Sequence, residues 1–96
     1  MKSCNDIIGV LRREKPQLER QFRVRALALF GSCARGNMTE DSDIDVLVDV
    51  DPSIGLDFVT LADRIEAILG RRTDVVSRRA ISERHWKEIE KDIIYV

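Results

Sequence analysis

The sequence predicts an α/β (α+β) fold in which helices pack on a small mixed sheet of about three strands, within a single domain over residues 1–96. Three observations lead to this prediction. The chain has 96 residues, which is the length of one ordinary domain. Its 44% of hydrophobic residues can supply one core without metal or disulfide cross-links. Segments with helical spacing alternate along it with segments of strand spacing, as in folds whose helices cover a sheet.

The first helix is predicted over residues 4–14. Ser3 and Asp6 have the spacing of a capping box, in which each side chain bonds the backbone amide of the other residue. Lys15–Pro16 is expected to end this helix, because proline lacks the amide hydrogen that a helix interior needs. Pro16 would then open a short second helical piece.

Two more helices are predicted further along the chain. A broad apolar stripe predicts a helix over residues 58–69, which Gly70 is expected to end. Ser82 is a typical N-cap for a final helix, where Ile81 can pack against Trp86 as a hydrophobic staple. The apolar edge of that last helix is expected to include Trp86, Ile89, Ile93 and Val96.

Three segments predict strands. The apolar run from Val24 to Phe30, which Gly31 ends, is typical of a buried strand. After a polar loop over residues 37–42, residues 43–50 alternate between apolar and mostly acidic side chains. One face of this second strand is therefore apolar and the other begins acidic. Residues 73–77 predict a short third strand.

Composition excludes several classes of function. The 16 Lys and Arg residues against 17 Asp and Glu residues give a net charge of -1. No excess of positive charge indicates a surface for duplex DNA or for an anionic membrane. No apolar run approaches the roughly 20 residues that span a bilayer, and the N-terminus does not have the pattern of a signal peptide. We therefore expect a cytoplasmic protein that binds no membrane and no duplex DNA.

The two cysteines and the one histidine predict no cross-link and no zinc site. Cys4 and Cys33 have neither the number nor the spacing of a disulfide framework or of a metal-ligand set. His85 has no cysteine near it in the sequence, and a surface or packing role is favoured for it.

A candidate phosphate site lies where the first strand ends. If a short helix starts after Gly31, its unpaired backbone amides point outward, and Ser32 adds a hydroxyl donor. Glycine suits the first position because a phosphate oxygen that contacts backbone amides needs a close approach without a Cβ. Arg35 lies one turn further on and can reach either the phosphate or a nearby carboxylate.

A candidate metal site follows on the next strands. Asp43 and Asp45 project from the same face of the second strand, about 7 Å apart at the backbone. Asp74 would complete a group of three carboxylates if the third strand lies beside the second. Such a group repels itself unless a cation is bound, and carboxylates with phosphate co-ligands favour Mg²⁺. Two Mg²⁺ ions bridged by these side chains would activate an attacking hydroxyl and stabilise a leaving pyrophosphate.

Four arginines flank the third strand. Arg71–Arg72 precede it and Arg78–Arg79 follow it. A solvated cationic cluster is the favoured interpretation. Neutralising a triphosphate and docking an acidic partner are the alternatives.

These residues carry a resemblance to a known family. The segments Gly31–Gly36, Ser42–Val48 and Thr73–Val76 resemble, in order and spacing, those of the minimal nucleotidyltransferases, the small relatives of the DNA polymerase β superfamily. The resemblance covers nearly the whole chain. It implies that Gly31 and Ser32 hold nucleotide phosphates, that Asp43 and Asp45 bind the two Mg²⁺ ions, and that Asp74 helps to activate the acceptor hydroxyl.

The same resemblance implies a function. Such domains transfer AMP from ATP to a tyrosine of a HEPN-type toxin and act as its antitoxin. The predicted elements use nearly all of the chain, so the surface that holds the acceptor is expected on a partner. Two alternatives remain open: a non-catalytic binding module that neutralises a partner by occlusion, and a transferase that acts on a small hydroxylated molecule.

Overall fold

The computed structural model describes residues 3–96, which form a four-stranded mixed sheet in the order β3-β2-β1-β4. The strands are β1 (Val24–Phe30), β2 (Ile44–Val50), β3 (Thr73–Ser77) and β4 (Ile94–Tyr95). β2 pairs antiparallel with β1 and parallel with β3, and β4 pairs antiparallel with the other edge of β1. The predicted mixed sheet is confirmed, with one strand more than expected.

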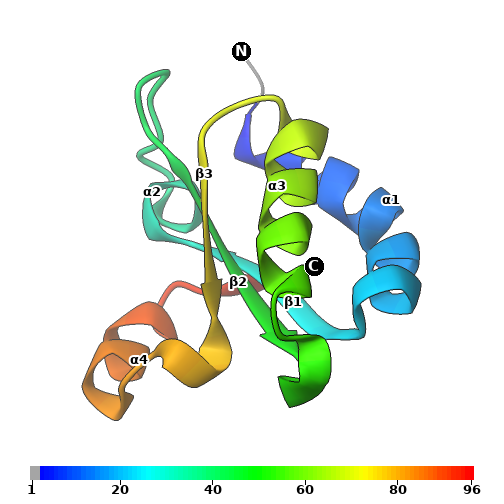
Figure 1. The fold of residues 1–96 in the computed structure, drawn as a ribbon. Helices are drawn as coiled ribbons and strands as arrows, with labels where there is room; N and C mark the ends of the chain where they lie inside the picture. The colour runs from blue at the N-terminus through cyan, green and yellow to red at the C-terminus, as the bar shows by residue number, and fades with distance from the viewer. Residues whose placement is uncertain (1–2) are drawn as a thin grey trace.

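Two long helices, α1 (Cys4–Phe22) and α3 (Asp57–Leu69), cover one face of the sheet, as Figure 1 shows. β2 contributes Ile44, Val46 and Val48 to the core between sheet and helices, and all three are fully buried. Burying an aliphatic side chain of this size contributes about 1.5 to 3 kcal/mol, so this face supplies much of the driving force for folding. The helices add buried residues at helical intervals: Ile7, Leu11 and Leu18 from α1, and Leu61, Ile65 and Leu69 from α3.

The opposite face of the sheet carries the alternate residues of β2, among them Asp45. Two short elements follow β3 on this side, the 3-10 turn η2 (Arg78–Ala80) and the helix α4 (Glu83–Ile89). Figure 1 shows α4 at the lower left, across the sheet from α3. The helix α2 (Gly31–Arg35) follows directly after β1, and the 3-10 turn η1 (Pro52–Ile54) joins β2 to α3.

The helix α1 runs unbroken through Pro16, so the predicted interruption at Lys15–Pro16 is wrong. A proline inside a helix costs about 3 kcal/mol. Leu18 and Phe22, which follow it, are both buried against the core. Their burial holds the last turns of α1 in place. The free energy gained by this packing outweighs the cost of Pro16 inside the helix.

The last predicted helix is shorter than expected, and its C-terminal part is a strand. α4 ends at Ile89, and Ile94–Tyr95 form β4 beside Ala28 and Leu29 of β1. This pairing supplies hydrogen-bond partners for backbone N–H and C=O groups of β1, which would be unpaired if β1 were an edge strand. The Val96 amide also donates to the Leu27 carbonyl at 2.9 Å.

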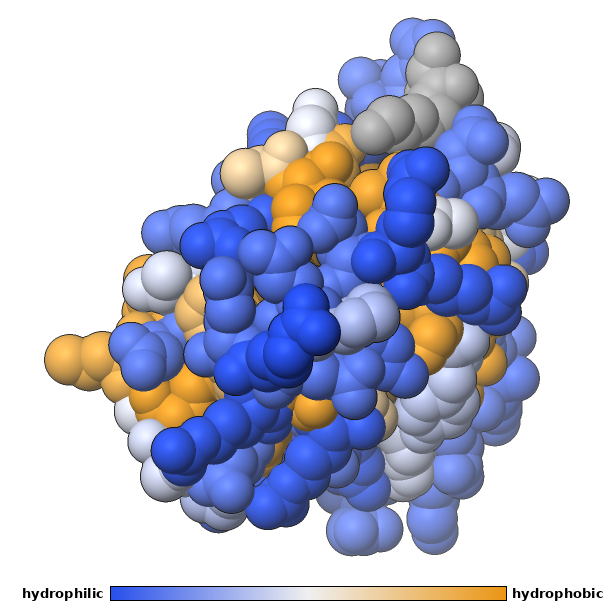
Figure 2. Space-filling view, turned by 90° about the vertical axis from the view of Figure 1, so that its right-hand side faces the viewer, coloured by the Kyte–Doolittle hydropathy of each residue, from blue (hydrophilic) through white to orange (hydrophobic). Residues whose placement is uncertain are grey.

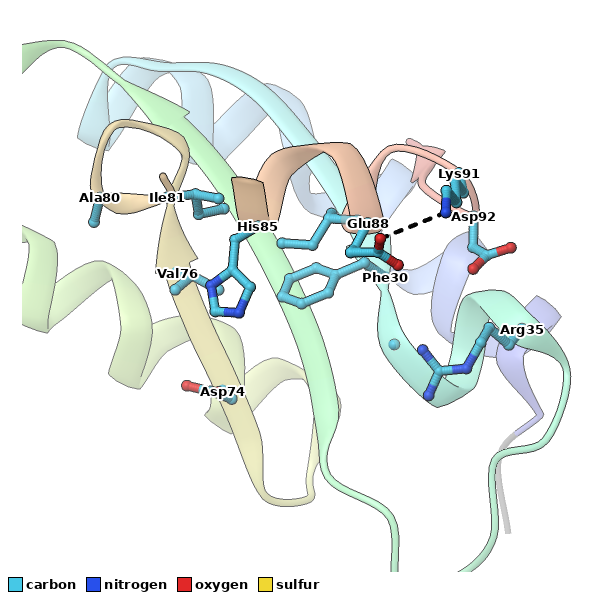
Figure 3. Close-up of a pocket in the computed structure, with 12 residues that line it drawn as sticks. Phe30, Arg35, Asp74, Val76, Ala80, Ile81, His85, Glu88, Lys91 and Asp92 are labelled. Carbon is cyan, nitrogen blue, oxygen red and sulfur yellow. Dashed lines mark hydrogen bonds and ion pairs between the residues drawn. The ribbon is translucent and has the colours of Figure 1, made fainter. Parts of the chain in front are cut away.

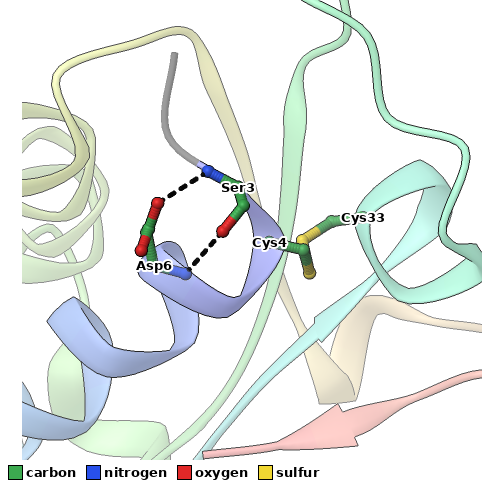
Figure 4. The surroundings of a disulfide bond; sticks show 4 residues. All are labelled: Ser3, Cys4, Asp6 and Cys33. Carbon is green, nitrogen blue, oxygen red and sulfur yellow. Dashed lines mark hydrogen bonds between the residues drawn. A yellow bond between two sulfur atoms is a disulfide. The ribbon is translucent and has the colours of Figure 1, made fainter.

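Cys4 and Cys33 form a disulfide, so the prediction that the two cysteines stay unlinked is wrong. The bond joins the first turn of α1 to α2 (Figure 4). The two residues lie 29 positions apart in the sequence, and no spacing pattern of cysteines marks such a pair. At the start of α1 the predicted capping box is confirmed. Ser3 and Asp6 exchange hydrogen bonds of 3.0 and 3.1 Å.

The surface over α1 is mostly hydrophilic, with apolar patches between the polar side chains (Figure 2). Leu56, Val59 and Tyr95 are large apolar side chains that lie exposed on the molecule. Within residues 3–96, no helix has the length and hydrophobicity needed to cross a membrane.

Reducing the Cys4–Cys33 disulfide is expected to destabilise the fold. A cross-link that closes a loop of this length stabilises a protein by about 3 to 4 kcal/mol, mainly by restricting the unfolded chain. Urea unfolding with and without dithiothreitol measures the effect, and the oxidised protein should unfold at the higher urea concentration. The midpoint of the Cys4→Ser control should not respond to the reductant. Equal midpoints for the wild-type protein in both conditions would contradict this prediction.

Candidate functional site

Asp45 and Asp74 lie side by side on neighbouring strands. β2 and β3 pair in parallel, and their register places Asp45 opposite Asp74. On the other side of β2, Asp45 is opposite Phe30, the last residue of β1. Asp43 comes directly before β2 and is half-exposed. The structure therefore brings the predicted acidic residues to one end of the sheet, on the face that carries α4.

Repulsion between the three carboxylates contributes to a raised pKa of Asp45. Its pKa is raised from the ordinary value near 3.8, first by partial burial and then by the negative charges of Asp74 and Asp43. The positive charge of Arg35 acts in the opposite direction. Arg35 therefore lies close enough to Asp45 to influence its pKa.

Gly31 packs directly against Asp45. Its φ is +70°, a backbone conformation that residues with a Cβ rarely adopt. A Cβ built on Gly31 would overlap the Oδ2 atom of Asp45. Glycine is thus required here for two reasons that the sequence did not reveal. These are the left-handed turn from β1 into α2 and the close approach of a carboxylate.

The short helix predicted after Gly31 is confirmed as α2. Its buried residue is Cys33, which the disulfide fixes to α1. Ser32 is partly exposed, and its carbonyl accepts a hydrogen bond from the Asn37 amide at 3.1 Å. Cys33 on one side and Asn37 on the other thus hold the candidate phosphate site in place.

Arg71 holds the loop that leads into the acidic strand. Its Nη2 atom donates to the carbonyls of Thr39 and Glu40 at 3.0 and 3.2 Å, and also to that of Ser42. Asp43 follows this loop directly. Sequence reasoning missed this role, because the acceptors are main-chain carbonyls, which any residue carries. Arg71 is therefore a structural residue, rather than a member of a solvated cluster.

Two of the other arginines near β3 also have defined partners. The Nε atom of Arg72 lies 3.3 Å from Asp43 Oδ1, in an ion pair whose two side chains are largely exposed. The Arg78 guanidinium stacks over the Trp86 ring, 3.9 Å from its centre. The expectation of a solvated cationic cluster is thus wrong for Arg71 and Arg78, whereas the Arg72 side chain is 86% exposed and agrees with it.

A cleft of about 520 Å³ opens beside the acidic residues. Phe30 and Gly31 line one side of it, and α4 lines another (Figure 3). Asp74 and Arg35 also border it. His85, for which the sequence favoured a surface or packing role, projects from α4 into this cleft.

The donors at this end of the sheet fit a divalent cation, although they are not arranged as a finished metal centre. Carboxylate oxygens are the ligands that Mg²⁺ prefers. Among residues 3–96, no three Asp, Glu, His or Cys side chains are grouped closely enough to hold one ion. Asp43 is instead paired with Arg72, but a pair this exposed contributes only about 1 kcal/mol or less. A cation can therefore compete for Asp43 at small cost, and it would relieve the repulsion at Asp45.

Replacing Asp45 by Asn is expected to stabilise the metal-free protein at neutral pH. A carboxyl whose pKa is raised by folding binds its proton more tightly in the folded state, so stability falls as the pH rises above its ordinary pKa near 3.8. Thermal unfolding in EDTA should give Asp45→Asn a higher Tm than the wild type at pH 7. The difference should shrink as the pH approaches the ordinary pKa.

Asp49→Asn is the matched control, because Asp49 lies on the same face of β2 but about 13 Å further along the strand. Its Tm should change less. A Tm of Asp45→Asn at or below the wild-type value at pH 7 would show that repulsion does not strain this site.

Comparison with known proteins places the site in a family. The nucleotidyltransferase domain family matches residues 11–96, which include every site residue described above. The protein adenylyltransferase MntA of Thermococcus cleftensis is 37% identical over 98 residues, covering 100% of this chain and 98% of that protein.

Solved structures have the same fold. One described as a minimal nucleotidyltransferase has a TM-score of 0.80 at 29% identity, covering 99% of this chain and 97% of that chain. A chain in a variant of the toxin–antitoxin MntA-HpeT has a TM-score of 0.66 at 26% identity, covering 100% of this chain and 72% of that chain. The conserved architecture and the family match lead to one conclusion: this chain is an enzyme of the nucleotidyltransferase domain family, of the minimal nucleotidyltransferase type.

Proposed function

We propose that this enzyme transfers AMP from ATP to a hydroxyl group of a protein acceptor, in a reaction that needs Mg²⁺. The pairing of Asp45 with Asp74 directly beside Gly31 is the observation that carries the proposal. It places mutually repelling carboxylates in contact with the turn from β1 into α2, so that a metal ion and phosphates can share one site. The name of the relative MntA, a protein adenylyltransferase, supports AMP as the transferred group and a protein as the acceptor.

The phosphates of ATP would lie against the turn from β1 into α2. There the backbone amides and the Ser32 hydroxyl donate hydrogen bonds to phosphate oxygens, which are strong because the acceptor is charged. The absence of a Cβ at Gly31 leaves room for the Asp45 carboxylate beside this turn. Arg35 adds a positive charge at the same end of the cleft.

Asp43, Asp45 and Asp74 would hold Mg²⁺, two ions in the arrangement expected from the sequence. When bound, the metal neutralises phosphate charge and makes an attacking hydroxyl more acidic. The acceptor oxygen forms a bond to the α-phosphorus, the bond from that phosphorus to the bridging oxygen of the β-phosphate breaks, and pyrophosphate leaves with the electron pair. Asp74 accepts the proton of the acceptor hydroxyl. Catalysis in this scheme consists mostly of positioning and charge neutralisation.

The acceptor is proposed to be a HEPN-type toxin, modified on a tyrosine. The described residues 3–96 form one sheet and the helices that cover it, and they include no second lobe that would grip a protein acceptor. The similarity to a chain of the toxin–antitoxin MntA-HpeT supports a toxin as the partner. In this role the enzyme would act as the antitoxin, inside the cytoplasm.

Transfer to the partner is expected to depend on the acidic residues. The purified protein, mixed with the HEPN-type protein encoded beside it, labelled ATP and Mg²⁺, should add an AMP mass to that protein. Asp74→Asn should abolish the transfer and keep much of the ATP binding, because Asp74 is assigned the proton of the acceptor. Intact mass spectrometry of the partner and calorimetry with ATP measure the two effects separately.

The double variant Asp43→Asn, Asp45→Asn distinguishes catalysis from occlusion. It should neither bind ATP in a manner that depends on Mg²⁺ nor neutralise the toxin. Asp49→Asn serves as the control and should behave as the wild type. If the double variant neutralises the toxin fully and leaves it without an adduct, neutralisation occurs by occlusion and the catalytic proposal is wrong.

Ser32→Ala tests the phosphate site on its own. The loss of a hydrogen bond to a charged phosphate should weaken ATP binding by about 1.5 to 3 kcal/mol, while the Tm stays close to the wild-type value because Ser32 is partly exposed. Calorimetry in the presence of Mg²⁺ measures the affinity. Unchanged affinity and unchanged turnover would place the phosphates elsewhere.

A further inference from the structure

The cleft beside the acidic residues begins at the candidate phosphate site and extends beneath α4. Gly31 and Arg35 line its one end, and Val76, Ile81 and His85 line the other. Figure 3 shows Phe30 between these two groups, with Arg35 on one side of it and His85 on the other. A ligand whose phosphates lie at Gly31 would therefore have its remaining part in this cleft.

We propose that the part of the cleft between Phe30 and α4 binds the nucleobase of the nucleotide, with the base against the rings of Phe30 and His85. The inference rests on the proposed function, because that function supplies a nucleotide whose phosphates lie at Gly31. It adds the site of the base, which the motifs of the sequence do not place.

The chemistry of the lining matches a flat, largely apolar ring. Phe30 offers an aromatic face at the end of β1, and His85 offers a second ring from α4 (Figure 3). Aromatic faces bind nucleobases by stacking, and this interaction tolerates any base because every base has a π face. Val76 and Ile81 add aliphatic contacts on the His85 side. Figure 3 shows Arg35 and Lys91, the arginine and the lysine of the lining, on the opposite side of Phe30 from His85, so the His85 side suits the uncharged base better than the phosphates.

The charged residues of the cleft favour the same orientation. Arg35 lies at the end where the phosphates are proposed to bind. Glu88 and Asp92 border the cleft from α4 and the turn after it, and Glu88 lies 3.5 Å from Lys91 in an exposed ion pair. Glu88 thus engages Lys91, the second Lys or Arg residue of the lining, and this leaves Arg35 as the cation for the phosphates.

The size of the cleft also suits a nucleoside. At about 520 Å³ it lies within the usual range of roughly 300 to 1,000 Å³ for small-molecule sites. A side chain of the acceptor protein, such as an aromatic ring, is the competing occupant. A test must therefore separate binding of the base from binding of the phosphates and from transfer.

Calorimetry with ATP and with inorganic tripolyphosphate, both in Mg²⁺, makes this separation. Tripolyphosphate has the phosphates without the base, so the wild-type protein should bind ATP more tightly. Phe30→Leu keeps an apolar side chain but removes the aromatic face, and His85→Ala removes an exposed ring without opening the core. Each substitution should weaken ATP binding by about tenfold, in line with the loss of one stacking contact, and leave tripolyphosphate binding unchanged.

Val59→Ala is the matched control, because Val59 is 60% exposed on α3, on the far face of the sheet. It should change neither affinity. If ATP binds no more tightly than tripolyphosphate, or if both ring variants bind ATP as the wild type does, the base lies outside this cleft. If the ring variants keep ATP affinity and lose transfer to the partner, the cleft holds the acceptor and the inference is wrong. If neither ligand binds the wild-type protein, the proposed function itself fails.

Discussion

Burial of one face of β2 must outweigh the electrostatic repulsion that the same strand creates on its other face. Ile44, Val46 and Val48 are fully buried against the helices, whereas Asp45, between the first two, faces a second carboxylate across the sheet. The alternation of side chains along a strand makes both possible at once. Several buried aliphatic side chains each contribute about 1.5 to 3 kcal/mol to the stability of the fold. Their sum can offset the repulsion between carboxylates on the opposite face of the same strand. Without a cation, the carboxylates at this end of the sheet repel one another, which contributes to the raised pKa of Asp45.

The loops around the acidic end of the sheet are held by contacts to the main chain and by a disulfide, rather than by ion pairs. One guanidinium, that of Arg71, binds carbonyls of the loop before Asp43, and the disulfide of Cys33 fixes α2 to α1. A planar guanidinium with several donors suits this task better than a lysine ammonium would. Preorganising the backbone in this way reduces the entropy that a ligand must remove when it binds. The site is thus held in position from both sides before any nucleotide is present.

The parts of this structure that follow from local patterns could be predicted from the sequence. The alternation in residues 43–50 correctly predicted β2 and its acidic face, and the resemblance correctly indicated the family. The continuous helix through Pro16 could not be predicted, because it depends on burial of Leu18 and Phe22 in a core formed by distant segments. β4 was missed for a similar reason, since a two-residue strand exists only where a neighbouring edge offers hydrogen bonds. The roles of Asp43, Asp45, Asp74, Gly31, Ser32 and Arg35 remain predictions.

The parallel pairing of β2 and β3 has a consequence for the order in which the molecule assembles. Parallel neighbours need a crossover connection, and here that connection contains η1 and α3, which lie between Val50 and Thr73 in the chain. Asp45 and Asp74 can therefore meet only when the chain that contains α3 closes into a loop, and closing a loop of this length has an entropic cost. A nascent or partly folded chain presents isolated carboxylates, each too weak to retain a divalent ion. If this end of the sheet holds Mg²⁺ as proposed, its affinity for the ion would require the completed fold, and the bound ion would stabilise the folded state against unfolding.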